Sequence, residues 1–172
     1  MDNNITWRMY GLVPYNISEI QKGIQFGHGV VEYAQQHFKD ENYQEWAKNH
    51  KTFIILNGGT SSTMIQHLSY LNSEDIKNTH FLEPDLNGMM SAVVFLVSSQ
   101  VFDYENYPDF YTFCLKNKGR NDLPQARSQF EKSQLQALAK EMDSSDYREW
   151  VEFMGGEKNI FLREFLSNFR LA

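Results

Sequence analysis

The segment "NISEIQKGIQFGHGVVEYAQQHF", residues 16–38, constrains the fold more than any other part of the chain. Its apolar residues recur every three or four positions, which predicts a helix. Asn16 with Glu19 three positions later fits a capping box at the start of this helix. Gly23, Gly27 and Gly29 lie inside it, and each costs about 1 kcal/mol relative to alanine. Close packing against a strand or a second helix would offset that cost.

Two stripes run along the predicted helix. We expect the apolar stripe to face a sheet, and it consists of Ile20, Ile24, Gly27, Val31, Ala34 and Phe38. The polar stripe consists of Gln21, Gln25, His28 and Glu32. A solvated face is the common explanation of such a stripe, but His28 is able to exchange a proton near neutral pH. As a site, the stripe would tolerate loss of Gln25 without unfolding, whereas a larger residue at Gly27 would push the helix off the sheet.

The rest of the N-terminal part alternates between strand and helix patterns. The segments that predict strands are 5–13, "TFIILN", "HFLE" and "SAVVFLV". A short helix around 43–49 and a second helix capped by Thr60, Ser61 or Ser62 lie between them. This order is typical of layered α/β domains. We therefore expect residues 1–100 to form a three-layer α/β sandwich with a mixed four-stranded sheet, in which "TFIILN" is a strand covered on both faces.

Residues 101–172 have a different pattern and predict a helical extension packed on the α/β domain. An aromatic-rich stretch is followed by a helix that Pro124 would begin and Met142 would end. Tyr147, Trp150 and Met154 are spaced for a further helix, which the glycines at 155 and 156 would stop. A last helix carries an apolar face over 160–169.

Charge and cysteine content limit the classes of function. The net charge of −6 argues against indiscriminate binding of nucleic acid, and most of the negative excess precedes Lys116. Cys114 is the only cysteine, which excludes an intramolecular disulfide. No secretion signal and no apolar run long enough for a membrane span is visible in the sequence. These features favour a cytoplasmic protein that does not contact a membrane.

The segments "IQKGIQFGHGVVEYA", "TFIILNGG" and "FLEPDLNGMMSAVVFLV" together resemble the type 2 peptidyl-tRNA hydrolase family over residues 5–99. In that family a lysine is followed four positions later by glutamine and then by a Gly-His pair. The resemblance implies a hydrolase, or a binder, of aminoacyl- or peptidyl-tRNA. It implies no cofactor.

Carried over residue by residue, the resemblance places a site on two segments. It matches Gln25 and His28 directly and puts Gln21 at the lysine position, with Lys22 next to it. The aspartate of the family corresponds to Glu83 or Asp85, and its threonine to Ser91. The implied catalytic residues are then Lys22, His28, Glu83 and Asp85, and the implied substrate-binding residues are Gln21, Gln25 and Ser91. A neutral Gln21 in place of an ammonium would weaken stabilisation of the transition state.

The glycine turn "NGGTSS" is a second candidate for binding substrate. A turn between a strand and a helix presents backbone N–H groups and hydroxyls to a phosphate, which here would involve Gly58, Gly59, Thr60 and Ser61. The segment has no Walker lysine, and a capped turn explains it equally. "HFLEPDLNG" is either an ordinary acidic turn or a group in which Glu83 and Asp85 join His80 as acid and base or as metal ligands. The spacing of His37, His50 and His67 predicts no zinc site.

Three functions remain open at this level. The first is hydrolysis or binding of an aminoacyl ester or a tRNA end. The second is binding or degradation of a small cyclic or dinucleotide signal of host defence, because short compact chains of this kind look like those of phages. The third is a catalytically inert interaction protein, and a homodimer through the apolar face of 159–172 is its simplest form.

Overall fold

A computed structural model describes residues 5–172. Its internal contacts divide the chain into two compact units. The first unit comprises the chain up to Ser99 together with Phe161–Ala172, and the second comprises Gln100–Ile160. The segment expected to form one extension from residue 101 onward is therefore shared between the two units, because the end of the last helix packs on the sheet.

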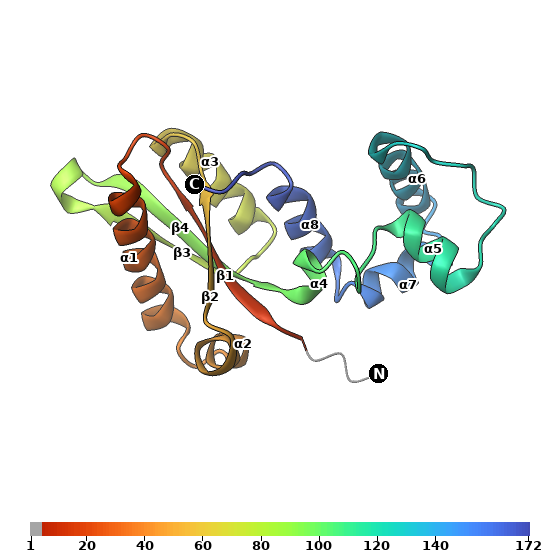
Figure 1. The fold of residues 1–172 in the computed structure, drawn as a ribbon, viewed down its shortest axis with the longest axis horizontal. Helices are drawn as coiled ribbons and strands as arrows, with labels where there is room; N and C mark the ends of the chain where they lie inside the picture. Colours follow the sequence, from red (N-terminus) through yellow and green to blue (C-terminus); the bar gives the residue numbers. More distant parts are fainter. Residues whose placement is uncertain (1–4) are drawn as a thin grey trace. The chain divides into compact units, whose positions relative to one another are not determined.

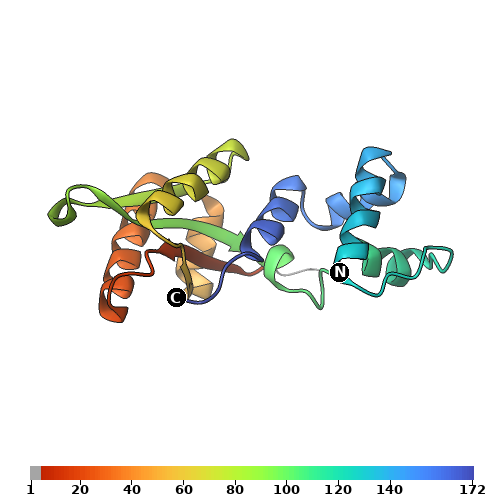
Figure 2. The same ribbon diagram turned by 90° about the horizontal axis from the view of Figure 1, so that it is seen from above.

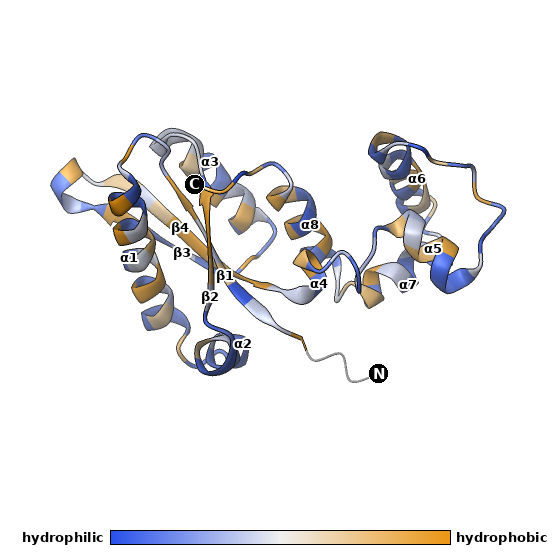
Figure 3. Cartoon of the chain, viewed as in Figure 1, coloured by the Kyte–Doolittle hydropathy of each residue, from blue (hydrophilic) through white to orange (hydrophobic). Residues whose placement is uncertain are grey.

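The first unit is built on the expected mixed four-stranded sheet, in the order β2-β1-β4-β3 (Figure 1). Its central strands are β1 (Trp7–Val13) and β4 (Met89–Ser98), which pair antiparallel. β2 (Thr52–Asn57) pairs parallel with β1, and β3 (Asn78–Glu83) pairs antiparallel with β4. All four predicted strands are present. The apolar colour along the middle of β4 in Figure 3 matches its central, buried position.

Helices cover both faces of the sheet, which confirms the three-layer α/β class. α1 (Glu19–His37) packs on β1, β4 and β3. α3 (Ser61–Ser73) lies on the other face, as both views of the ribbon show (Figures 1 and 2). The end of α8 (Glu157–Leu166) joins α3 there, since Phe165 contacts Phe95 of β4 with ring centroids 6.2 Å apart. Leu162 and Phe165 of the apolar face that suggested self-association are thus buried, whereas Leu171 is 75% exposed.

The central strand β1 and the edge strand β2 differ in how they are covered. β1 is buried continuously from Met9 to Val13, because it lies inside the sheet with helices on both faces. β2 is an edge strand, so Thr52 and Phe53 remain exposed, and the expectation of two covered faces was wrong. Its outer edge is partly closed by the last residues of the chain, where the N–H of Asn57 donates to the carbonyl of Arg170 at 2.9 Å.

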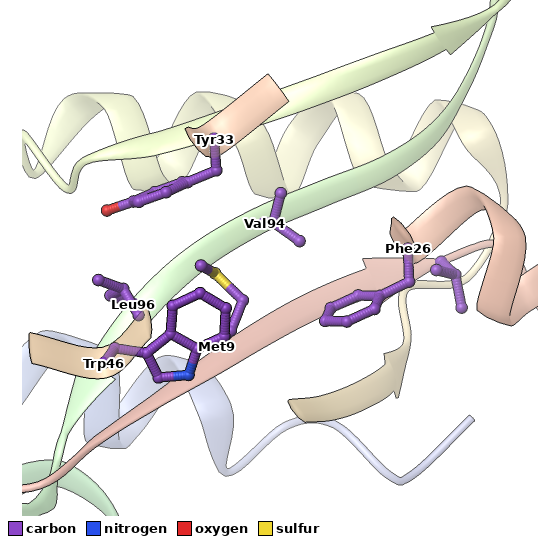
Figure 4. Close-up of a cluster of buried hydrophobic side chains, with 7 residues drawn as sticks. Met9, Phe26, Tyr33, Trp46, Val94 and Leu96 are labelled. Carbon is purple, nitrogen blue, oxygen red and sulfur yellow. The ribbon is translucent and has the colours of Figure 1, made fainter. Parts of the chain in front are cut away.

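The core between α1 and the sheet explains how the glycine-bearing helix packs. Its buried side chains are Met9, Val13, Phe26, Tyr33, Trp46, Val94 and Leu96 (Figure 4). Trp46 comes from the π-helical turn η1 (Trp46–His50), which follows α2 (Glu41–Glu45) where one short helix was expected. A Cβ at Gly29 would lie 2.9 Å from Cγ2 of Val94. Gly29 therefore permits the close approach of α1 to β4.

The predicted orientation of α1 was wrong. A Cβ at Gly27 would meet no atom within 4 Å, and the same holds for Gly23. Ile20 is 77% exposed and Val31 is 55% exposed, so the supposed sheet-facing stripe points to solvent. The helix is apolar on a second face, which carries Phe26 and Tyr33, and the larger aromatic residues occupy the core. Its N-cap is Ser18 rather than Asn16.

The second unit is a helical assembly around aromatic residues. It contains α5 (Phe110–Lys118), α6 (Gln129–Glu141) and α7 (Ser145–Phe153), and it shares α4 (Ser99–Phe102) and α8 with the first unit. Phe110 and Trp150 meet edge to face at 5.7 Å, and Trp150 Nε1 donates to the carbonyl of Pro108 at 3.2 Å. α6 begins after Ser128, which forms a capping box with Glu131, and not at Pro124 as predicted.

Candidate functional site

A pocket of about 520 Å³ lies beside the first turns of α1, within the first unit. Its wall is formed by the start of α1, the end of β3, the short 3-10 helix η2 (Pro84–Leu86) and the start of β4. The lining residues are Ile17, Ser18, Gln21, Ile24, Gln25, His28, Glu83, Asp85, Leu86, Met89 and Ser91. Six of the eleven residues proposed from the sequence meet here: Gln21, Gln25, His28, Glu83, Asp85 and Ser91.

Gln25 is the central polar group of this pocket. It is only 4% exposed, and both ends of its side-chain amide are bonded. Nε2 donates to Oε2 of Glu83 at 2.5 Å, and Oε1 accepts from the hydroxyl of Ser91 at 2.6 Å. These two bonds tie α1 to both strands of the β3–β4 pair. Gln25 thus faces the sheet and is buried, so the expectation that it lies on an exposed polar face was wrong.

A β-bulge aims Ser91 at Gln25. Phe81 is opposite Ala92 and Leu82 is opposite Met90, so Ser91 is the extra residue on β4. A bulge breaks the alternation of side chains along a strand and re-aims the residue that it contains. Two neighbouring side chains of β4 consequently point toward α1: Ser91 bonds Gln25, and Ala92 lies close to the backbone of Gly29. Ser91 is fully buried, and its hydroxyl also lies 3.4 Å from the carbonyl of Phe81.

The two acidic residues of the pocket come from the connection between β3 and β4. Glu83 ends β3, and its second carboxylate oxygen, Oε1, accepts only a long bond of 3.5 Å from the N–H of Asp85. Asn87 and Gly88 close the connection with positive φ angles of 54° and 72°. Within residues 5–172, neither Glu83 nor Asp85 forms an ion pair with a lysine, an arginine or a histidine.

His28 supplies a flat surface at the pocket. Its ring stacks on Phe81 of β3, with centroids 4.5 Å apart and planes inclined by 18°. His28 is exposed, and no ring of the described residues other than Phe81 is stacked on it. One face of the imidazole is therefore available to a ligand.

Lys22 does not line the pocket. Its ammonium lies 2.9 Å from Oε1 of Glu19 on the preceding turn of α1. One position along a helix is a rotation of about 100°, which turns Lys22 away from the face that carries Gln21 and Gln25. No lysine or arginine is present among the described residues that line the pocket.

The glycine turn is likewise separate from the lining of the pocket. The N–H of Gly58 donates to the carbonyl of Val13 at 2.8 Å, and the N–H of Gly59 donates to Oδ1 of Asn57 at 2.9 Å. Thr60 is the N-cap of α3 and accepts from the N–H of Thr63, whereas Ser61 is the first helical residue. The donors of Gly58 and Gly59 that were candidates to hold a phosphate are therefore engaged, that of Gly58 by β1 and that of Gly59 by Asn57.

Sequence reasoning missed the apolar walls of the pocket. Ile17, Leu86 and Met89 were not proposed, and Ile24 was assigned to the core instead. Leu86 and Met89, two large apolar residues within "PDLNGM", were the available signal for an apolar wall. Turns rich in Pro, Asp, Asn and Gly are usually polar. The pocket therefore combines an apolar rim with a small polar base, as ligand sites generally do.

The described residues contain neither a cluster of metal ligands nor a membrane-spanning helix. Between residues 5 and 172, no three His, Cys, Asp or Glu side chains are grouped as metal ligands would be. No helix in that range is long and apolar enough to cross a membrane. Cys114 is buried, which raises the pKa of its thiol to about 11 and makes it a poor nucleophile.

Comparison with protein families found no family that matches this chain, and comparison with curated proteins found no match either.

Proposed function

We propose that the pocket binds the acylated 3′ end of a tRNA and hydrolyses the ester that joins the acyl group to the ribose. The observation that carries this proposal is the bond between Gln25 and Glu83, which fixes a carboxylate at the base of an apolar-rimmed pocket. The resemblance to type 2 peptidyl-tRNA hydrolases supports the same reaction. Gln25, His28 and Ser91, which were matched through that resemblance, all line this pocket.

Glu83 is the proposed general base. Its Oε2 is held by Gln25, so Oε1 remains to accept a proton from water. The water oxygen attacks the ester carbonyl carbon, the bond from that carbon to the ribose oxygen breaks, and Glu83 returns the proton to the ribose. The products are a free acid and a free hydroxyl. The described lining residues include no lysine or arginine that could stabilise the developing oxyanion, and the amide of Gln21 is a neutral donor, so we expect slow turnover.

His28 and the apolar rim would position the substrate. The free face of the His28 ring suits stacking of the terminal adenine, because every base has a π-face that an aromatic ring can contact. Ile24 and Met89 would contact the acyl group. With a net charge of −6, the protein has little general attraction for the phosphate backbone, so we expect recognition of the tRNA end alone.

The decisive experiment measures release of a labelled acyl group from aminoacyl-tRNA and from N-acetylated aminoacyl-tRNA. We expect release above a heat-denatured control for at least one substrate, and a loss of about 100-fold or more in Glu83→Gln. Glu32→Gln is the matched control, because Glu32 lies on the same helix outside the lining of the pocket. Absence of release from both substrates would exclude the hydrolase. A gel shift with uncharged tRNA then separates binding from catalysis.

A small phosphate-rich nucleotide is a weaker candidate for this pocket. Two acidic residues and no lysine or arginine line it in the described part of the chain, and such a lining repels a phosphate. Thermal-shift measurements with cyclic and dinucleotides test this alternative directly. A marked stabilisation by any of them would favour it over the ester hydrolase.

A further inference from the structure

We infer that the pocket selects acyl groups that carry a protonated amine, so that aminoacyl esters with a free α-amino group are preferred to N-blocked or peptidyl esters. This inference rests on the proposed binding of an acylated nucleoside. It specifies which acyl groups are preferred, and the hydrogen bond between Gln25 and Glu83 alone does not specify them.

The carboxylates of the pocket lack a cationic partner. Glu83 accepts one strong bond from the neutral amide of Gln25 and one long bond from the N–H of Asp85. Asp85 is exposed at the rim and forms no ion pair with any described residue. The nearest ammonium along the helix, that of Lys22, is held by Glu19. A cation that enters this pocket therefore meets no competing lysine or arginine among the described residues that line it.

The shape of the polar group also suits an amine. Glu83 is the N-cap of η2 and Asp85 lies within it, and both residues line the same pocket. An ammonium has three donors, so it is able to bond Asp85 and also Oε1 of Glu83, whose second lone pair stays open to the attacking water. A metal ion would require further ligands, and no third acidic or histidine ligand is grouped with these two in the described chain. The ligand itself is then the source of the positive charge.

The apolar rim distinguishes an amino acid from a simple ammonium ion. Ile17, Ile24, Leu86 and Met89 surround the polar base on more than one element, so an aliphatic or aromatic side chain is accommodated beside the charged amine. Acetylation of the amine removes its charge and two of its three donors. It also adds a carbonyl oxygen, which the carboxylates repel. The pocket thus favours the free amine through attraction and disfavours the blocked amine through repulsion.

The test compares puromycin, a stable aminoacyl-nucleoside amide with a free α-amino group, with N-acetylpuromycin. Binding is measured by calorimetry at about pH 6, where an α-amino group is protonated. We expect puromycin to bind about tenfold more tightly or better, consistent with a charge pair in a partly enclosed site. Asp85→Asn should reduce this preference, and Glu83→Gln should reduce it further. Glu32→Gln, outside the lining of the pocket, should retain it.

Equal affinity for the two compounds, or no binding of either, overturns the inference. A preference that survives the double change of Glu83→Gln and Asp85→Asn also overturns it. The two proposals fail in distinguishable ways. Equal rates of hydrolysis for free and N-acetylated aminoacyl-tRNA would contradict amine selection and leave the hydrolase standing, whereas selective binding of puromycin without any hydrolysis would contradict the hydrolase alone.

Discussion

Nε2 of Gln25 lies 2.5 Å from Oε2 of Glu83, although 58 positions separate the two residues in the chain. The bond joins the second turn of α1 to the last residue of β3. The packing of α1 and the geometry of the pocket therefore depend on each other, because a change that moves α1 also moves the carboxylate of Glu83.

Replacing Gln25 should destabilise the fold as well as the site. Gln25→Ala leaves the fully buried hydroxyl of Ser91 without its short bond and opens a small void, so we expect a loss of about 1–3 kcal/mol in the free energy of unfolding. Gln21→Ala, one turn earlier and exposed, should cost no more than about 0.5 kcal/mol. Urea denaturation measures both. Equal stabilities for the two variants would show that the network contributes nothing to folding.

The glycines of α1 should respond in opposite directions. Gly29→Ala places a Cβ 2.9 Å from Val94 and 3.1 Å from Ala92, and overpacking of this kind costs about 1–3 kcal/mol. Gly27→Ala meets open space and should stabilise the helix by up to about 1 kcal/mol. Melting temperatures of the pair test the orientation of α1. A fall for Gly27→Ala and none for Gly29→Ala would mean that the helix is rotated.

His28 should matter for binding through its ring and not through its protons. His28→Ala removes the surface beside Phe81 and should weaken binding of an aminoacyl-nucleoside about tenfold, in line with the value of base stacking. His28→Phe should retain binding within about threefold, since a phenyl ring also stacks. Calorimetry with puromycin measures both. Equal losses in the two variants would instead assign a role to the imidazole nitrogens.

Lys22 should be dispensable for turnover. Lys22→Met retains the apolar stem of the side chain and removes only its pairing with Glu19, which is worth about 0–1 kcal/mol at a surface. We expect the rate of ester hydrolysis to change by no more than about fivefold, the factor that corresponds to such an energy. A loss as large as that of Glu83→Gln would show that the ammonium reaches the reacting ester.

Asp40 should make stability fall in acid. Burial favours the protonated form, but hydrogen bonds from Lys77 and from the N–H groups of Tyr43 and Asn42 outweigh it and hold the pKa of Asp40 below its ordinary value of 3.8. Because the pKa is lower in the folded state, this contribution is complete above pH 3.8 and is lost as the pH falls through the folded value.

Asp40→Asn keeps a good N-cap for α2 but loses the charge. Its deficit in unfolding free energy relative to the natural protein should therefore be present at neutral pH and should shrink in acid. Urea denaturation across this range checks the trend, and Lys77→Met should reproduce it. A deficit that stays constant with pH would assign the effect to the cap alone.

The sequence by itself determined the four strands, the two longest helices of the first unit and the order of these elements. The period of three to four in residues 16–38 and the apolar runs "TFIILN" and "SAVVFLV" depend on local patterns, and the structure has a helix or strand at each. The caps were partly predictable, as Thr60 shows, because a hydroxyl beside the first helical N–H groups is a local interaction. The acidic turn between the last two strands was predictable for the same reason.

Only the tertiary structure decided which face of α1 is buried. The helix carries one apolar stripe through Ile24 and Val31 and another through Phe26 and Tyr33, so periodicity alone does not choose between them. The choice follows from the close packing of α1 on β4, which only the face with Gly29 permits. The stripe through Gly27 therefore faces solvent, and its Ile24 lines the pocket.

The site itself depends on that choice and on the bulge at Ser91. A bulge is a mismatch between two strands, and neither strand encodes it alone. It turns the hydroxyl of Ser91 toward Gln25, and the rotation of α1 brings Gln25 to meet it. Residue types and spacing were therefore sufficient to nominate Gln25, Glu83 and Ser91. Their meeting in one network was decided by the packing of a helix on two strands distant from it in sequence.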